Sequence, residues 1–85
     1  MEIIRTNEFN AALQKLPKEI QNLYHTQEVR FRTNWRDSRL HLKKVKGLLY
    51  AFSFRITRRY RVFFYFQNSD TAIFFDVDHR KDIYH

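Results

Sequence analysis

The sequence predicts an α+β domain in which an N-terminal strand and an αα-hairpin pack on a three- to four-stranded antiparallel β-meander. Three observations predict this class. Apolar residues recur at helical spacing through the first third of the chain, and they alternate with polar residues from residue 50 onward. The alternating runs are joined by short connections, which require antiparallel neighbours. At 85 residues we expect one domain, spanning residues 1–85.

The first third of the chain is predicted to form a strand and two helices. Ile3 and Ile4 indicate a short strand, and Asn7 is expected to cap the first helix. Pro17 stops that helix and can begin a second one, which is expected to run to about Thr33. The residues that follow helical spacing are Phe9, Ala12, Leu13 and Leu16, and then Ile20, Leu23, Tyr24, Gln27, Phe31 and Asn34.

The remainder is predicted to be a loop followed by strands. The loop covers Trp35 to Arg39, a short strand or extended arm covers Leu40 to Lys43, and Gly47 breaks the chain before the meander. The helices are expected to cover one face of the meander. The alternating sets are Tyr50, Phe52, Phe54 and Ile56 against Ala51, Ser53, Arg55 and Thr57; Tyr60, Val62, Phe64 and Phe66 against Arg61, Phe63, Tyr65 and Gln67; and Thr71, Ile73, Phe75 and Val77 against Ala72, Phe74, Asp76 and Asp78.

Positive charge is concentrated in the middle of the chain. The formal net charge is +7, and residues 30–61 hold eleven cations against Asp37 alone, for a net charge of +10. Residues 1–29 carry a net charge of −1 and residues 62–85 carry −2. A local field of that size attracts a polyanion and speeds the encounter with it. We therefore expect a nucleic acid or an acidic protein as partner, the alternative being a solvated basic surface.

The composition excludes most classes of catalytic site. The chain has no cysteine and one glycine, so it offers neither a thiolate metal site nor a Gly-rich phosphate loop. Asp76, Asp78 and His79 could in principle hold a divalent ion, but their spacing is not diagnostic of a metal site. We expect no cofactor and no metal. Metal-free ribonucleolysis remains, in which the 2′-OH of RNA attacks the adjacent phosphate.

Arginines on neighbouring strands are the leading candidates for phosphate binding. Arg55 lies on the polar face of its predicted strand, Arg61 follows in the next strand, and Arg80 lies near the end of the chain. A guanidinium binds phosphate bidentately and stays charged, which suits a phosphorane-like transition state. The alternative is a surface charge or a partner for Asp76 or Asp78. Aromatic residues make up 18% of the chain, and we expect some of them to form a surface patch for a partner.

Four segments together carry a family resemblance. They are Leu42–Gly47 (LKKVKG), Tyr50–Thr57 (YAFSFRIT), Tyr60–Val62 (YRV) and His79–Tyr84 (HRKDIY). Their order over nearly the whole chain resembles the RelE/ParE superfamily, the toxins of type II toxin–antitoxin systems, and is most like the RelE and YoeB branches. The resemblance implies a RelE-like fold and the activity of a ribosome-dependent mRNA endonuclease.

The resemblance assigns candidate catalytic roles position by position. Arg55 stands at a basic position of the first meander strand. Arg61 corresponds to the arginine that stabilises the transition state, and Arg80 falls near a late arginine of the family. Tyr84 corresponds to a C-terminal catalytic tyrosine, the alternative being an aromatic residue packed on the sheet edge.

The proton acceptor and the RNA-binding surface complete the predicted site. Ser53 occupies a position where the RelE branch carries a lysine, and Arg39 one where the YoeB branch carries a glutamate. The general base is therefore left open among His41, Lys43, His79 and His85. The residues expected to bind RNA are Arg36, Arg39, Lys43, Lys44, Lys46, Arg58 and Arg59.

The leading prediction is a metal-independent endoribonuclease that cuts mRNA in the ribosomal A site and so inhibits translation. An alternative with the same fold is a ParE-like toxin that inhibits DNA gyrase by protein–protein contact and has no nuclease activity. A third is an RNA-binding or interaction module without toxicity. The cluster of Arg55, Arg61, Arg80 and Tyr84 favours the nuclease, because a gyrase inhibitor needs no catalytic cluster.

The expected partners are a cognate antitoxin, bound in a toxin–antitoxin hetero-oligomer, and the mRNA with ribosomal RNA. An acidic antitoxin would complement the basic segment. The N-terminus has no apolar signal-peptide region and no stretch approaches the length of a membrane span. We therefore expect a cytoplasmic protein with no membrane partner.

Overall fold

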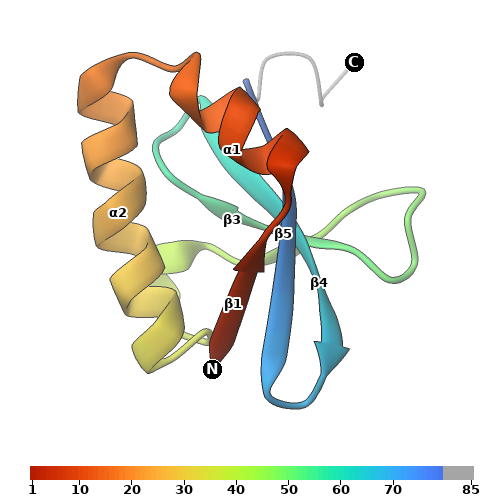
Figure 1. The fold of residues 1–85 in the computed structure, drawn as a ribbon. Helices are drawn as coiled ribbons and strands as arrows, with labels where there is room; N and C mark the ends of the chain where they lie inside the picture. The colour runs from red at the N-terminus through yellow and green to blue at the C-terminus, as the bar shows by residue number, and fades with distance from the viewer. Residues whose placement is uncertain (80–85) are drawn as a thin grey trace.

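The computed structural model describes residues 1–79 as a five-stranded mixed sheet with two helices on one face (Figure 1). The helices are α1 (Asn7–Gln14) and α2 (Lys18–Thr33), followed by a 3₁₀ turn, η1 (Ser38–Leu40). The strands are β1 (Glu2–Arg5), β2 (Lys43–Lys44), β3 (Phe52–Arg55), β4 (Tyr60–Asn68) and β5 (Thr71–His79). This arrangement confirms the predicted α+β class.

The sheet has the strand order β1-β5-β4-β3-β2. Strands β3, β4 and β5 form the predicted antiparallel meander, and β2 adds a short antiparallel edge. Strand β1 pairs in parallel with β5, with Ile3 opposite Ala72. The αα-hairpin supplies the crossover that a return to the other edge of the sheet requires.

The core is aromatic and lies between the helices and the sheet. Phe31 of α2 is its centre, with ring centroids 5.0 Å from Phe64, 5.1 Å from Phe74 and 5.4 Å from Phe54. Phe9 of α1 packs 5.7 Å from Phe74. All five rings are fully buried. Aromatic pairs in tilted and edge-to-face geometry add attraction beyond the burial of their area, so the small domain is stabilised by interlocking rings.

The cap of α1 differs from the expectation. Thr6, not Asn7, is the N-cap, and its hydroxyl accepts a hydrogen bond from the Phe9 backbone amide at 3.1 Å. An N-cap needs an extended backbone, which Thr6 has with φ −69° and ψ 162°. Pro17 stands at the N-cap position of α2, and α2 ends at Thr33, as predicted.

The predicted strand from Leu40 to Lys43 is wrong. Leu40 is buried in η1, and His41 has a left-handed backbone with φ 48°. The carboxylate of Asp37 accepts a hydrogen bond from the Arg39 amide at 2.9 Å, which favours a tight turn over an extended arm. Pairing with β3 is left to Lys43 and Lys44 alone.

The alternation predicted along β5 is broken by an irregularity. Phe63 lies opposite Asp76 but the next residue, Phe64, lies opposite Phe74, so Phe75 is an extra residue on β5. Phe74 therefore points into the core, whereas Asp76 shares a face with Phe63. The expectation that Ala72 and Phe74 lie on the same face as Asp76 and Asp78 is wrong.

Gln27 ties α2 to the segments that carry the basic residues. Its side-chain amide is buried and donates to the carbonyl oxygens of Arg39 at 3.0 Å and Arg55 at 2.7 Å. Its side-chain oxygen accepts from Arg30 at 2.8 Å. One glutamine thus joins the helix, η1 and the end of β3. Within residues 1–79, no helix has the length and apolarity that crossing a bilayer demands.

Replacing Gln27 by leucine should destabilise the fold by about 1–3 kcal/mol, because two buried carbonyls lose their donor. The measurement is urea unfolding monitored by circular dichroism. Asn22→Ala, at an exposed position of the same helix, is the control and should change stability by less than about 0.5 kcal/mol. Equal stability of the Gln27→Leu and Asn22→Ala proteins would contradict the role given to Gln27.

Candidate active site

The sheet face opposite α1 and α2, called the distal face below, carries the polar side chains of the meander. The strand register arranges them in rows. One row is Lys43, Ser53, Phe63 and Asp76, one residue from each of β2, β3, β4 and β5. The adjoining row is Arg55, Arg61 and Asp78. Directly opposite residues in antiparallel strands have Cβ atoms about 4.5–5.5 Å apart, so the two rows form one compact site.

Arg61 is held rigidly in this site. Its side chain is 1% exposed. Its Nε donates to the Ser53 hydroxyl at 2.8 Å, and its Nη2 donates to the backbone oxygens of Ser53 at 3.2 Å and His41 at 2.5 Å. These bonds join β4, β3 and the turn before β2. Burying a cation is costly unless hydrogen bonds compensate. These three hydrogen bonds offset the cost of burying the Arg61 guanidinium.

A pocket of about 200 Å³ adjoins this guanidinium. Its lining combines Arg61 and Ser53 with Phe63 and the β2 segment Lys43, Lys44, Val45 and Lys46. Drug-sized ligands occupy roughly 300–1,000 Å³, so the pocket suits a small group such as one phosphate. A guanidinium and three ammonium groups around one hollow make a strong local positive field. The arrangement can bind and stabilise an anion.

Aromatic side chains lie on the same face beside the pocket. The ring of Tyr65 lies 5.7 Å from those of Tyr50 and Phe75, and Phe63 lies 6.5 Å from Phe75. Tyr50 is 59% exposed. Aromatic faces next to a basic groove are the usual platform for stacking single-stranded bases. The predicted aromatic surface patch therefore adjoins the anion pocket.

The predicted catalytic residues are only partly brought together. Arg55 lies directly opposite Arg61, and its Nε is buried without a hydrogen-bond partner among residues 1–79. His41 is exposed and contributes its backbone oxygen to Arg61. His79 is the last residue of β5, and its backbone pairs with Tyr60. Arg80, Tyr84 and His85 lie outside the described residues.

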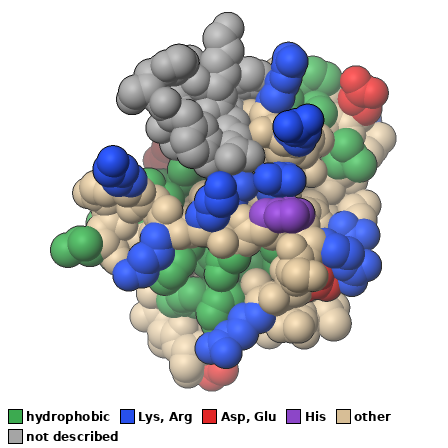
Figure 2. Space-filling model, turned by 180° about the vertical axis from the view of Figure 1, so that it is seen from behind, with side chains coloured by type: hydrophobic (Ala, Val, Ile, Leu, Met, Phe, Trp, Pro, Cys, Tyr) green, Lys and Arg blue, Asp and Glu red, His purple; other side chains and the backbone are tan. Residues whose placement is uncertain are grey.

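The predicted RNA-binding residues are spread over the molecule. Arg58 and Arg59 are exposed in the turn that precedes β4, whereas the guanidinium of Arg36 lies 4.8 Å from the Trp35 ring, in a hollow with Phe66 at the far end of β4. Figure 2, seen from behind Figure 1, shows Lys and Arg side chains gathered around a histidine, with acidic side chains toward the margins. The basic residues therefore lie on several parts of the surface. Among the predicted RNA-binding residues, Lys43, Lys44 and Lys46 border the anion pocket.

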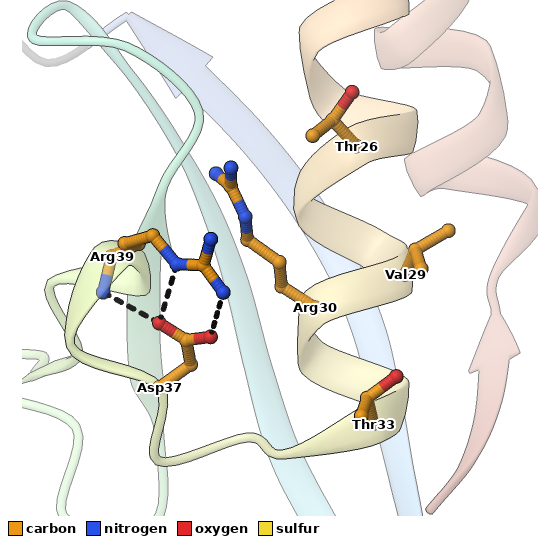
Figure 3. Close-up of a pocket in the computed structure, with 6 residues that line it drawn as sticks. All are labelled: Thr26, Val29, Arg30, Thr33, Asp37 and Arg39. Atoms are coloured by element: carbon orange, nitrogen blue, oxygen red, sulfur yellow. Dashed lines mark hydrogen bonds and ion pairs between the residues drawn. The ribbon is translucent and has the colours of Figure 1, made fainter.

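Arg39 lies in a different pocket, of about 490 Å³, between α2 and η1 (Figure 3). Its guanidinium and the carboxylate of Asp37 face each other, with Nε–Oδ1 at 3.0 Å and Nη2–Oδ2 at 2.7 Å. Hydrogen bonds from the Arg39 side chain and amide lower the pKa of Asp37 to about 2. Arg39 is thereby engaged within its own turn and does not face the anion pocket.

Sequence reasoning missed two parts of the site. Ser53 was singled out only because it replaces a family lysine, whereas here its hydroxyl is the acceptor that orients Arg61. Asp76 was considered only as a metal ligand or as a partner of an arginine, whereas the register places it opposite Phe63, which lines the pocket. Burial raises the pKa of Asp76 above the usual carboxyl value. Among residues 1–79, no cluster of His and acidic side chains could hold a metal ion.

Ser53→Ala should destabilise the protein by about 1–3 kcal/mol, because the buried Nε of Arg61 loses its acceptor. Ser69→Ala removes a hydroxyl from an exposed turn and is the control. Thermal unfolding of the two variants makes the comparison. An unchanged midpoint for Ser53→Ala would show that the hydroxyl does not orient Arg61.

The depressed pKa of Asp37 predicts how the turn at η1 responds to acid. A carboxyl whose folded pKa lies below its unfolded value of 3.8 stabilises the fold above that value, and the contribution is lost as pH falls toward about 2. The Asp37→Asn protein should lack this part of the acid destabilisation. Stability curves between pH 5 and pH 2 test it, and parallel curves for the two proteins would be the contrary result.

Comparisons with known proteins agree on the fold. No family model matches the chain, and no curated protein sequence does. The toxin–antitoxin complex RelB–RelE of Methanococcus jannaschii contains a chain that is 27% identical, with 95% of this chain and 94% of that chain covered and a TM-score of 0.75. For the RelBE2 complex of Mycobacterium tuberculosis the identity is 25%, the coverage 93% and 96%, and the TM-score 0.65.

More distant sequences share the same architecture. A YoeB/ParE toxin from Agrobacterium tumefaciens is 13% identical, with 93% and 98% of the chains covered and a TM-score of 0.76. At such identity the likeness speaks for the fold alone. The strand, helical hairpin and five-stranded mixed sheet described above are common to these structures. The resemblance read from the sequence is confirmed, and the chain has the fold of the RelE-like toxin superfamily.

Proposed function

We propose that the protein is the toxin of a type II toxin–antitoxin pair and that it cleaves mRNA bound to the ribosome in the cytoplasm. The RNA supplies the nucleophile in this reaction, so the protein needs no metal. The 2′-OH attacks the neighbouring phosphate, and the protein orients the RNA and stabilises the charge of the transition state. The similarity to RelE, at 27% identity over nearly the whole chain, supports the toxin role.

The main observation for this proposal is the position of the Arg61 guanidinium, which is fixed beside the anion pocket. Its guanidinium is fixed by hydrogen bonds to Ser53 and to the His41 backbone, so its positive charge is held in one place at the wall of the pocket. Preorganised charge of this kind is usually the largest single contribution to catalysis. The small volume of the pocket suits one phosphate group.

The neighbouring residues have distinct roles in this proposal. Lys43, Lys44 and Lys46 hold the RNA backbone, and the aromatic residues beside the pocket stack the flanking bases. Arg55, opposite Arg61, adds positive charge at the scissile phosphate. The contributions of Arg80 and Tyr84 rest on the family resemblance: a further phosphate contact and a base-stacking or proton-transferring tyrosine.

The proposed protein partner is a cognate antitoxin. The solved structures of similar toxins from M. jannaschii and M. tuberculosis are toxin–antitoxin complexes. An acidic segment of the antitoxin would be attracted to the basic residues 30–61, where the net charge is +10. We propose that the two proteins form a hetero-oligomer in which the antitoxin blocks the access of RNA to the anion pocket.

Induction of the protein without an antitoxin should stop growth and produce cuts within translated messages. Primer extension on total RNA maps these cuts. Lys44→Ala with Lys46→Ala removes two exposed cations at the pocket and should reduce the cuts strongly. It should also lower the salt slope of RNA binding by about 1.4, at roughly 0.7 per cation for a single strand.

Lys15→Ala with Lys18→Ala is the matched control, because it makes the same change of charge at exposed positions distant in sequence from the pocket. This variant should cut like the wild type. A gyrase supercoiling assay is run beside it. Growth arrest with inhibited supercoiling and intact messages would overturn the nuclease proposal in favour of a ParE-like target, and harmless expression would overturn both.

A further inference from the structure

The proposed reaction needs a group that takes the proton of the 2′-OH, and the structure offers one that none of the family correspondences provides. The row across the distal face ends in Lys43 on β2 and in Asp76 on β5, with Ser53 and Phe63 between them. Strands lie about 4.8 Å apart, so the backbones at the two ends are separated by roughly 14 Å. Phe63 and Arg61 line the pocket at the Lys43 end of this row, and Asp76 lies opposite Phe63 on the neighbouring strand.

Attack on a phosphate of this kind is in line, so the entering and leaving oxygens lie on opposite sides of phosphorus. A site that moves protons at both oxygens therefore needs a base on one side and an acid on the other. A carboxylate at one end of the row and an ammonium at the other meet this requirement. Arg61 lies in the adjoining row and lines the pocket, where its positive charge can stabilise the equatorial oxygens.

The surroundings of Asp76 suit a proton acceptor. Its carboxylate Oδ1 accepts a hydrogen bond from the Val77 amide at 2.8 Å, which fixes the group. No residue among 1–79 forms an ion pair with it, although the chain is strongly basic. Partial desolvation raises the pKa of this exposed carboxyl, the Val77 hydrogen bond opposes the rise, and the charge of Asp78 adds to it. The net upward shift makes Asp76 a stronger base.

We propose, on the basis of the proposed function, that Asp76 is the general base of the RNA cleavage. The Asp76 carboxylate takes the proton from the 2′-OH as the 2′-oxygen bonds to phosphorus. The bond from phosphorus to the 5′-oxygen breaks, and that oxygen takes a proton from the Lys43 ammonium. The products are a 2′,3′-cyclic phosphate and a free 5′-OH, and exchange with water restores both side chains.

The charged groups that face Asp76 set its behaviour with pH. They are Asp78 on its own strand, Arg61 on β4, Arg55 on β3 and Lys43 on β2. Asp78 is the other carboxyl group among them. The acid limb of the pH–rate profile should therefore report a carboxyl group, with the rate falling as pH decreases.

The test is single-turnover cleavage of a ribosome-bound message by wild type, Asp76→Asn, Asp76→Glu and Asp70→Asn between pH 5 and pH 9. Asp76→Asn should cleave about 10²–10⁴-fold more slowly and should lack the acid limb. Asp76→Glu, which keeps the carboxylate, should recover part of the rate. Asp70→Asn removes the same charge from the exposed turn between β4 and β5 and should cleave like the wild type.

Binding separates this role from a structural one. Asp76→Asn should bind a message with a 2′-deoxy nucleotide at the cleavage site as tightly as the wild type, or more tightly, because a negative charge is lost. Wild-type rates for Asp76→Asn, or equal losses for Asp76→Asn and Asp70→Asn, would overturn the inference alone. A wild-type protein that cleaves no message would overturn the proposed function and this inference together.

Discussion

The structure depends on one buried cation. Arg61 donates to the hydroxyl and carbonyl of Ser53 and to the carbonyl of His41, and so connects two central strands with the turn that leads into β2. This connection acts together with the buried Leu40 and with the Gln27 hydrogen bond to Arg39 in holding the turn at His41 against the rest of the fold. The lysines of the pocket follow directly after that turn, so their position depends on the same guanidinium. In the proposed function Arg61 therefore serves both stability and chemistry, so a change in activity after its replacement has to be compared with the change in stability.

The two faces of the sheet have different roles in this protein. Rings from both helices and three strands fill one face, which provides the stability that a chain of 85 residues needs. The other face can then carry a guanidinium, ammonium groups and carboxylates in register. Collecting cations there opposes folding through their mutual repulsion. A bound phosphate or an acidic antitoxin segment relieves this repulsion, which couples ligand binding to stability.

Much of this arrangement could be predicted from the sequence, because periodicity reports burial. The stripe of Tyr24, Gln27 and Phe31 predicted α2, and the alternation of Arg61 with Val62 predicted β4. The sequence predictions failed where local hydrogen bonds or an extra residue determine the course of the backbone. The Asp37 carboxylate and the left-handed His41 replaced an expected strand, and the extra residue Phe75 moved Phe74 into the core. No periodic pattern could show that Ser53, at a position where the RelE branch carries a lysine, would accept the hydrogen bond that orients Arg61.

The account rests on an Arg61 guanidinium that is fixed in the fold and also meets the RNA phosphate. Nuclear magnetic resonance of arginine side chains tests both properties in one experiment. The Arg61 Nε–H should exchange slowly with water in the free protein, because it is buried in a hydrogen bond to Ser53. It should shift when a short RNA with a 2′-deoxy cleavage site is added, and the shift should fade at high salt. An Arg61 signal that exchanges as fast as those of the exposed Arg58 and Arg59, or that stays unchanged at saturating RNA, would contradict the account.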